Sequence, residues 1–188
     1  MYGLINKAIK MLVCERYGEA QWERLYKAAG IDNDLFISME KYPDKLTYDL
    51  VAQAPNVFGI ASDDFLKEIG EYWISYTGNG DYRDIFKLAG NNFVSFLENI
   101  NTIHSRVAVI FPTLTPPIFQ CVDVEANSLR LEYYSKRKGL SPMIFGLIKG
   151  LGHRFNTRVE VKQESLGAKD KDCDVFLIRF YPKTKETR

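Results

Sequence analysis

The spacing of hydrophobic residues divides the chain into two parts. Over residues 3–111 apolar side chains recur every three or four positions, as they do on the buried face of an amphipathic helix. This pattern predicts a run of helices. Their apolar and boundary positions are Ile5, Ile9, Leu12 and Val13 up to Gly18; Trp22 and Leu25 up to Gly30; Leu46, Leu50 and Val51; Phe65, Ile69, Trp73 and Tyr76 between Ser62 and Gly78; Ile85, Phe86 and Leu88; and Phe93, Phe96, Leu97, Ile100, Ile103, Val107 and Ile110 from a cap at Asn91 or Asn92 to Pro112.

After the proline-rich segment 112–117 the period of the pattern changes to two, which is typical of strands. Helices followed by mostly antiparallel strands predict an α+β fold, whose C-terminal part has a four-stranded sheet and a packed helix. We expect a site between the two parts. The first pair of predicted strands is 118–125 and 129–135, joined by a turn at Asn127-Ser128, and the second pair is 158–163 and 174–181. A helix lies between the two pairs. It begins with Ser141 as its cap and Pro142 at its first helical position, and it runs to about residue 155.

Composition narrows the class of protein. A chain of 188 residues with 46% hydrophobic content is typical of one domain with one well-filled core. Its formal charge of +1 favours neither nucleic acid nor an anionic membrane as a partner. No signal sequence and no run of about 18 apolar residues is visible, so we expect a cytoplasmic protein. Cys14, Cys121 and Cys173 are widely spaced, which predicts packed, reduced thiols rather than disulfides or zinc ligands.

The chain has two histidines, His104 and His153, as possible imidazole ligands for a metal or a haem. His104 follows Ile100 by four residues and precedes Val107 by three, which places it on the apolar face of the longest predicted helix. A buried histidine is usually a hydrogen-bonded core residue, so spacing alone leaves both roles open.

A second candidate is the tyrosine–serine–arginine motif, formed by Tyr133, Ser135 and Arg137. A spacing of two along a strand points all three side chains to one face, where two hydroxyls and a guanidinium suit paired carboxylates. The alternative is a solvated strand face with a basic end, since exposed arginines are common. Haem needs both an axial imidazole and partners for two propionates, and this chain can supply both.

Further segments join these two features. They are residues 1–8 (MYGLINKA), residues 97–104 (LENINTIH) and the pair Pro116-Pro117. Together with the motif, which follows His104 by about thirty residues, they resemble the H-NOX (haem nitric oxide/oxygen binding) domain, above all cyanobacterial stand-alone members and the haem domain of the soluble guanylate cyclase beta subunit. The resemblance implies a single domain over 1–182, with an N-terminal helical part (1–62) and a part of helices and sheet (63–182). We expect the tail 183–188 to be disordered.

The resemblance also implies roles for the matching residues. His104 is the only protein ligand to the iron of haem b (iron protoporphyrin IX), which lies between the two parts, and the tyrosine–serine–arginine motif holds the propionates. Ile5 and Pro117 press on the porphyrin and bend it. Asn101 is a departure, because relatives usually have aspartate there, so the contacts around His104 stay open.

Oxygen-binding relatives carry a tyrosine near the start of the helix that follows the motif, and residues 140–145 contain none. Ser141 is the nearest hydrogen-bond donor, but we expect its hydroxyl to cap the helix. The resemblance places Trp73, Met143 and Leu147 in the distal pocket, although Trp73 also fits a plain core position at helical spacing. Both interpretations predict an apolar pocket.

These features predict a haem-based gas sensor rather than an enzyme. It would bind nitric oxide and carbon monoxide at ferrous haem, exclude oxygen, and signal through a weakened iron–His104 bond and a conformational shift. Its partner would be a signalling protein such as a histidine kinase or a cyclase. Two alternatives remain: a haem-free module that binds another flat anionic ligand, and a haem enzyme for peroxide or nitrite, which would need a distal acid or base.

Overall fold

The computed structural model describes residues 1–79, 82–111, 114–164 and 173–182. Its elements follow the predicted order, and the α+β class is confirmed. The helices are α1 (Gly3–Tyr17), α2 (Glu19–Ala28), α3 (Asp44–Phe58), α4 (Ser62–Asn79), α5 (Arg83–Lys87), α6 (Phe93–Ile110) and α7 (Ser141–Arg154), and the strands are β1 (Ile118–Val122), β2 (Ser128–Tyr134), β3 (Thr157–Glu164) and β4 (Cys173–Pro182). None of the helices in these ranges is long and apolar enough to cross a membrane.

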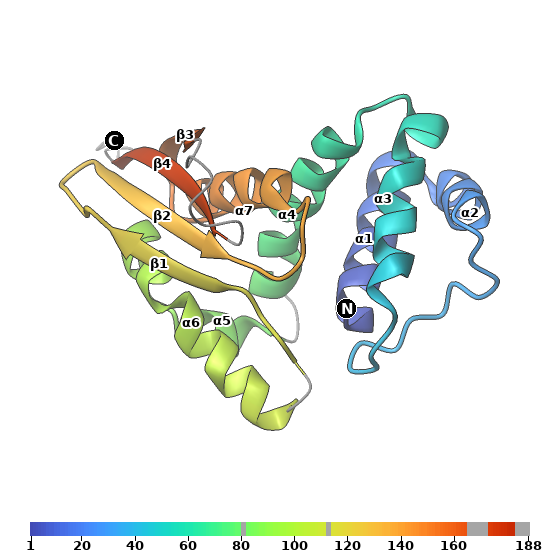
Figure 1. Ribbon diagram of the computed structural model, residues 1–188, viewed down its shortest axis with the longest axis horizontal. Coiled ribbons are helices and arrows are strands. Elements are labelled where there is room, and N and C mark those ends of the chain that lie inside the picture. Colours follow the sequence, from blue (N-terminus) through green and yellow to red (C-terminus); the bar gives the residue numbers. More distant parts are fainter. Residues whose placement is uncertain (80–81, 112–113, 165–172, 183–188) are drawn as a thin grey trace, which may run out of the picture.

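The strands form one antiparallel sheet in the order β1-β2-β4-β3. Burial alternates along β2, because Leu129, Leu131 and Tyr133 point to the covered face of the sheet. That face packs against α6 and α7 (Figure 1). The sheet, α6 and α7 therefore share one hydrophobic core.

A second hydrophobic cluster holds the N-terminal helices together. It joins α1, α2 and α3 to the first half of α4, where Phe65 and Ile69 are buried. Further along α4, Ile74 belongs to the core under the sheet. Figure 1 shows the N-terminal helices on one side and the sheet on the other, with α4 between them. Both clusters thus depend on α4.

The helices α4 and α7 cross with their backbones in contact. A Cβ atom at Gly70 would overlap the Met143 carbonyl oxygen, and one at Gly146 would overlap the Lys67 carbonyl oxygen. Two glycines that face each other's helix allow this approach. The crossing determines where the α7 side chains next to it, Met143 and Leu147, lie relative to α4.

Two local predictions are wrong. The first strand ends at Val122, not at residue 125, because Asp123 adopts a positive φ of 49° that breaks the extended backbone. Ser141 is not the cap of α7, since Leu140 occupies that position and the Ser141 hydroxyl donates to Asp174 Oδ2 at 2.8 Å. The sheet brings an acceptor that the local sequence does not reveal. The predictions for Pro112 and for the tail 183–188 fall outside the described residues.

Candidate functional site

His104 is held in one tautomer. Its Nδ1 lies 3.1 Å from the carbonyl oxygen of Pro117, and a carbonyl oxygen can only accept a hydrogen bond. Nδ1 therefore carries the proton and Nε2 keeps its lone pair. Burial lowers the pKa of His104 from 6.5, although the bond to Pro117 opposes the shift. A neutral imidazole, fixed through Nδ1, is the form in which histidine binds a metal.

The other histidine is in a different environment. The His153 side chain is 66% exposed, and its Nδ1 lies 3.1 Å from Glu71 Oε1 at the surface of α7. An exposed imidazole paired with a carboxylate is poorly placed to hold a large apolar cofactor. Of the two, His104 is the candidate ligand.

The tyrosine–serine–arginine motif is held together differently from the prediction. The strand β2 ends at Tyr134, so strand geometry does not orient Ser135 and Arg137. Instead, the Ser135 hydroxyl accepts a hydrogen bond from the Arg137 amide at 3.1 Å, and the side chains of Tyr133 and Ser135 are hydrogen-bonded. Local side-chain hydrogen bonds thus gather the three residues at the end of β2.

Ring contacts connect this motif to the histidine. Tyr133 is 4% exposed, and burial raises the pKa of its hydroxyl. Its ring lies 5.2 Å from that of Phe119, which in turn lies 6.0 Å from the His104 imidazole. The candidate ligand and the candidate propionate partners therefore sit along one packed row of rings.

Arg137 has a partner that sequence reasoning missed. Its Nε donates to Asp44 Oδ2 at 2.8 Å and its Nη1 to the Thr115 carbonyl oxygen at 3.0 Å. Asp44 also pairs with the Met1 ammonium group. Burial raises the pKa of Asp44, but hydrogen bonds from the N-terminus and Arg137 outweigh it, so the pKa falls below 3.8. No sequence signal marks this contact, because Asp44 and Arg137 are 93 positions apart.

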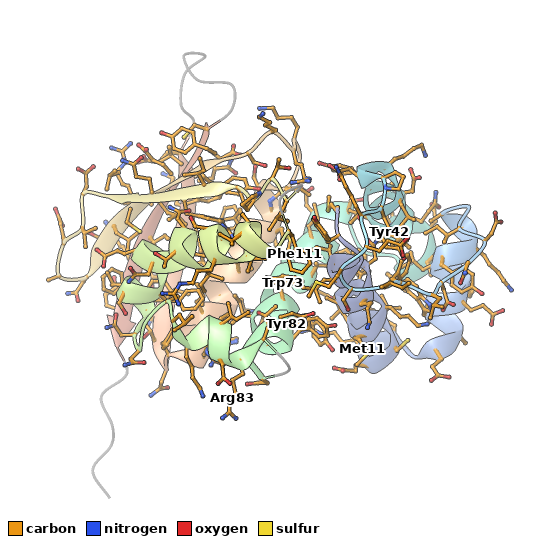
Figure 2. The ribbon with its side chains drawn as sticks, turned by 90° about the horizontal axis from the view of Figure 1, so that it is seen from below. Met11, Tyr42, Trp73, Tyr82, Arg83 and Phe111 are labelled. Carbon is orange, nitrogen blue, oxygen red and sulfur yellow. The ribbon has the colours of Figure 1, made fainter. Side chains whose placement is uncertain are left out.

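The remaining predicted site residues are apolar and only partly buried. Ile5 lies at the edge of the N-terminal cluster, and Pro117 presents its carbonyl to His104. Met143 packs against the N-terminal cluster, whereas Trp73 and Leu147 pack against the core under the sheet. Figure 2 shows Trp73 between the N-terminal helices and the sheet. These side chains thus lie at the rims of both clusters.

The structure groups the predicted residues in two sets. His104, Pro117 and the tyrosine–serine–arginine motif are joined through the contacts above, while Met143 and Leu147 lie beside Gly70 at the crossing of α4 and α7. In the described ranges, the hydrogen bond and the ring contact of His104 are with Pro117 and Phe119, not with Met143 or Leu147. This donor set fits haem: a neutral imidazole, hydroxyls and a guanidinium at one edge, and apolar side chains around them.

Comparison with known proteins agrees with this chemistry. The model of the haem-NO-binding family, HNOB, matches residues 2–163. The chain belongs to the haem-NO-binding family. Two Caenorhabditis elegans relatives are soluble guanylate cyclase gcy-35, 30% identical over 95% of this chain, and gcy-31, 28% identical over 86%. The chain spans about a quarter of each cyclase, 27% and 23%.

Solved structures of the haem-NO-binding family share the fold. An H-NOX protein from S. oneidensis, in the Fe(II)NO ligation state, has a TM-score of 0.85 at 18% identity and covers 96% of this chain and 99% of its own. Unliganded Fe(II) H-NOX from K. algicida has a TM-score of 0.83 at 22% identity, with full coverage of both chains. The family is one of haem-based gas sensors, and the predicted resemblance is confirmed.

Proposed function

We propose that this chain binds haem b between the N-terminal helices and the sheet and senses nitric oxide, with His104 as the iron ligand. The observation that carries the proposal is the state of His104, a neutral imidazole whose Nδ1–H donates to Pro117 and whose Nε2 keeps its lone pair. Bound haem would supply an iron atom that can bind diatomic gases, and His104 would hold that iron.

In this proposal the tyrosine–serine–arginine motif holds the propionates. Tyr133 and Ser135 carry hydroxyl donors, and Arg137 carries a charged fork that is partly buried. Asp44 and Thr115 orient the guanidinium from the protein side. Ile5 and Pro117 press on the porphyrin from the rims of the two parts.

We further propose that the distal pocket accepts nitric oxide and carbon monoxide but excludes oxygen. Met143 and Leu147 have no donor, and the Ser141 hydroxyl is already bonded to Asp174. Trp73 is the one proposed distal residue with a donor, its indole N–H. The reduced protein should form no stable oxygen complex in air, and the reduced Trp73→Phe variant should also form none. An oxygen complex that forms in the wild type but not in Trp73→Phe would contradict the proposal.

The proposed output is a movement of α6. An iron bound by His104 would hold the helix at this residue, in addition to the hydrogen bond with Pro117 and the ring contact with Phe119. At the end of the helix, Phe111 contacts the ring of Tyr2 in the N-terminal part at 5.8 Å. A shift of α6 would therefore reach the N-terminal helices and change the surface offered to a signalling protein, such as a histidine kinase or a cyclase.

Visible spectra of the purified protein test the proposal. The protein should show haem absorption as isolated, and its reduced form should respond to nitric oxide. A colourless protein that cannot be reconstituted with haem would refute haem binding and favour a haem-free module.

Replacing His104 with glycine should remove the haem ligand. Haem should be lost during purification and regained when imidazole is added, because free imidazole can fill the space of the missing side chain. His153→Gly is the matched control and should keep the haem. An unchanged spectrum of His104→Gly without imidazole would show that another group ligates the iron.

Replacing Arg137 with alanine should weaken haem retention, because the propionates lose a charge-assisted hydrogen bond of about 1.5–3 kcal/mol. This corresponds to roughly tenfold or more in the rate of haem transfer to an acceptor protein. Lys136→Ala removes an exposed charge one position away and should leave that rate unchanged. Equal rates in the two variants would count against the role of Arg137.

A further inference from the structure

Asn101 joins the helix that carries His104 to the edge of the sheet. Its Nδ2 donates to the Phe119 carbonyl oxygen at 2.5 Å, and its Oδ1 accepts from the Phe119 amide at 3.0 Å. Phe119 pairs with Tyr133 of β2, and β1 is an edge strand of the sheet. Every second residue of an edge strand turns its N–H and C=O away from the sheet. The Asn101 carboxamide takes the place of one residue of a neighbouring strand.

This clasp, the pair of hydrogen bonds between Asn101 and Phe119, requires a carboxamide. One end of the side chain must donate to a carbonyl, and the other must accept from an amide. An aspartate could accept from the Phe119 amide, but its second oxygen would face the Phe119 carbonyl oxygen. A hydrophobic side chain would leave both backbone groups without this partner.

The clasp lies where the burial of α6 changes. Before it, the helix is anchored by the Asn92 capping box and by core side chains. After it, the side chains described between residues 102 and 111 are at most partly buried, and Val109 is 81% exposed. The buried side chains of the first half are Phe93, Phe96 and Leu97. His104 follows the clasp by three residues, within one turn.

We propose that Asn101 is a positioning residue for His104: its clasp on Phe119 sets the register of α6 on β1, and so sets where the imidazole meets the iron. The inference rests on the proposed function, in which His104 ligates haem. Asn101 and His104 bind residues 119 and 117 of the same segment, so the two contacts define one register. Any movement of His104 is then confined to the part of α6 beyond the clasp.

Resonance Raman spectra of the reduced, haem-loaded protein test this directly. Asn101→Asp keeps one hydrogen bond of the clasp and Asn101→Ala keeps none, so both should shift the iron–histidine stretching band, and the alanine variant should shift it further. Asn99 is the matched control, because it lies on the same helix, is exposed, and donates to the Ser95 carbonyl oxygen of its own helix. An iron–histidine band at the same frequency in Asn99→Ala and Asn101→Ala would overturn the proposal.

A second comparison asks whether the effect passes through the helix. In His104→Gly reconstituted with imidazole, the ligand is no longer attached to α6, so adding Asn101→Ala should no longer shift the iron–imidazole band. A shift of the same size in this background would overturn a positioning role, since it would reach the haem by another route.

Hydrogen exchange of the Phe119 amide tests the clasp independently of haem spectra. Asn101→Ala should speed exchange about tenfold, as expected for one lost hydrogen bond, and Asn101→Asp should largely keep the protection. Unchanged exchange in Asn101→Ala would overturn the clasp, and with it the positioning role of Asn101, but it would leave the proposal that His104 ligates haem intact. Failure of the proposed ligation by His104 would show differently, because His104→Gly would then keep its spectrum without imidazole. That result would overturn both proposals.

Discussion

The carboxylate of Asp44 links the N-terminal part to Arg137. Hydrogen bonds to it keep its folded pKa below 3.8 despite burial, so its contribution to stability is present above about pH 3.8 and lost as the pH falls through the folded pKa. Asp44→Asn should lower the free energy of unfolding at pH 7 by at most about 1 kcal/mol, because solvent screens a carboxylate that is 40% exposed.

Denaturant unfolding at several pH values checks this prediction. The difference between wild type and Asp44→Asn should shrink toward zero as the pH falls below 3.8. Asp49→Asn is the control, since Asp49 lies on the same helix and pairs with Lys45 of its own helix rather than with the N-terminus or Arg137. A difference that grows in acid would have the wrong sign and would contradict the assignment.

Residue-level predictions succeeded where the contact is local. The cap of α6 is Asn92, one of the two positions that the sequence offered, because a side chain and an amide three residues later decide it. Ser141 has the same capping chemistry, yet its hydroxyl bonds to Asp174 of β4. That carboxylate lies 33 positions away, and only the packing of the sheet brings it to the start of α7.

Among the elements, the crossing of α4 and α7 is the contact most sensitive to side-chain size. Gly146→Ala should destabilise the protein by about 1–3 kcal/mol, because the added methyl overlaps the Lys67 carbonyl oxygen and forces the helices apart. Helix propensity alone has the opposite sign, since alanine is favoured over glycine by about 1 kcal/mol. A higher melting temperature for Gly146→Ala would therefore contradict the close crossing.

Hydrophobic periodicity located the elements well. The predicted strand pair 158–163 and 174–181 corresponds to β3 and β4, because alternation with period two is a property of each strand by itself. Periodicity did not reveal the sheet order, in which β4 lies between β2 and β3. It also did not reveal that α4 serves two clusters, because both of its ends are simply apolar in sequence.

At the scale of the whole molecule, we propose that residues 1–182 form one cooperative domain, because α4 contributes to both hydrophobic clusters. The chain's two tryptophans report on them separately: Trp22 is buried in the N-terminal cluster, and Trp73 packs against the core under the sheet. Trp22→Phe and Trp73→Phe each leave one reporter. Fluorescence and far-ultraviolet circular dichroism should give coincident unfolding midpoints in each variant, whereas separate midpoints would indicate two independent units.

The sequence by itself determined the elements, the α+β class, and the pairing of one candidate imidazole with one candidate motif for carboxylates. These follow from interactions between residues a few positions apart, and the family resemblance linked them to haem. Only the tertiary structure decided that Pro117 selects the tautomer of His104, that Asp44 engages Arg137, and that Asn101 clasps the edge of β1. Those contacts join separate elements, so they depend on how the elements pack, and no local pattern of residues encodes them.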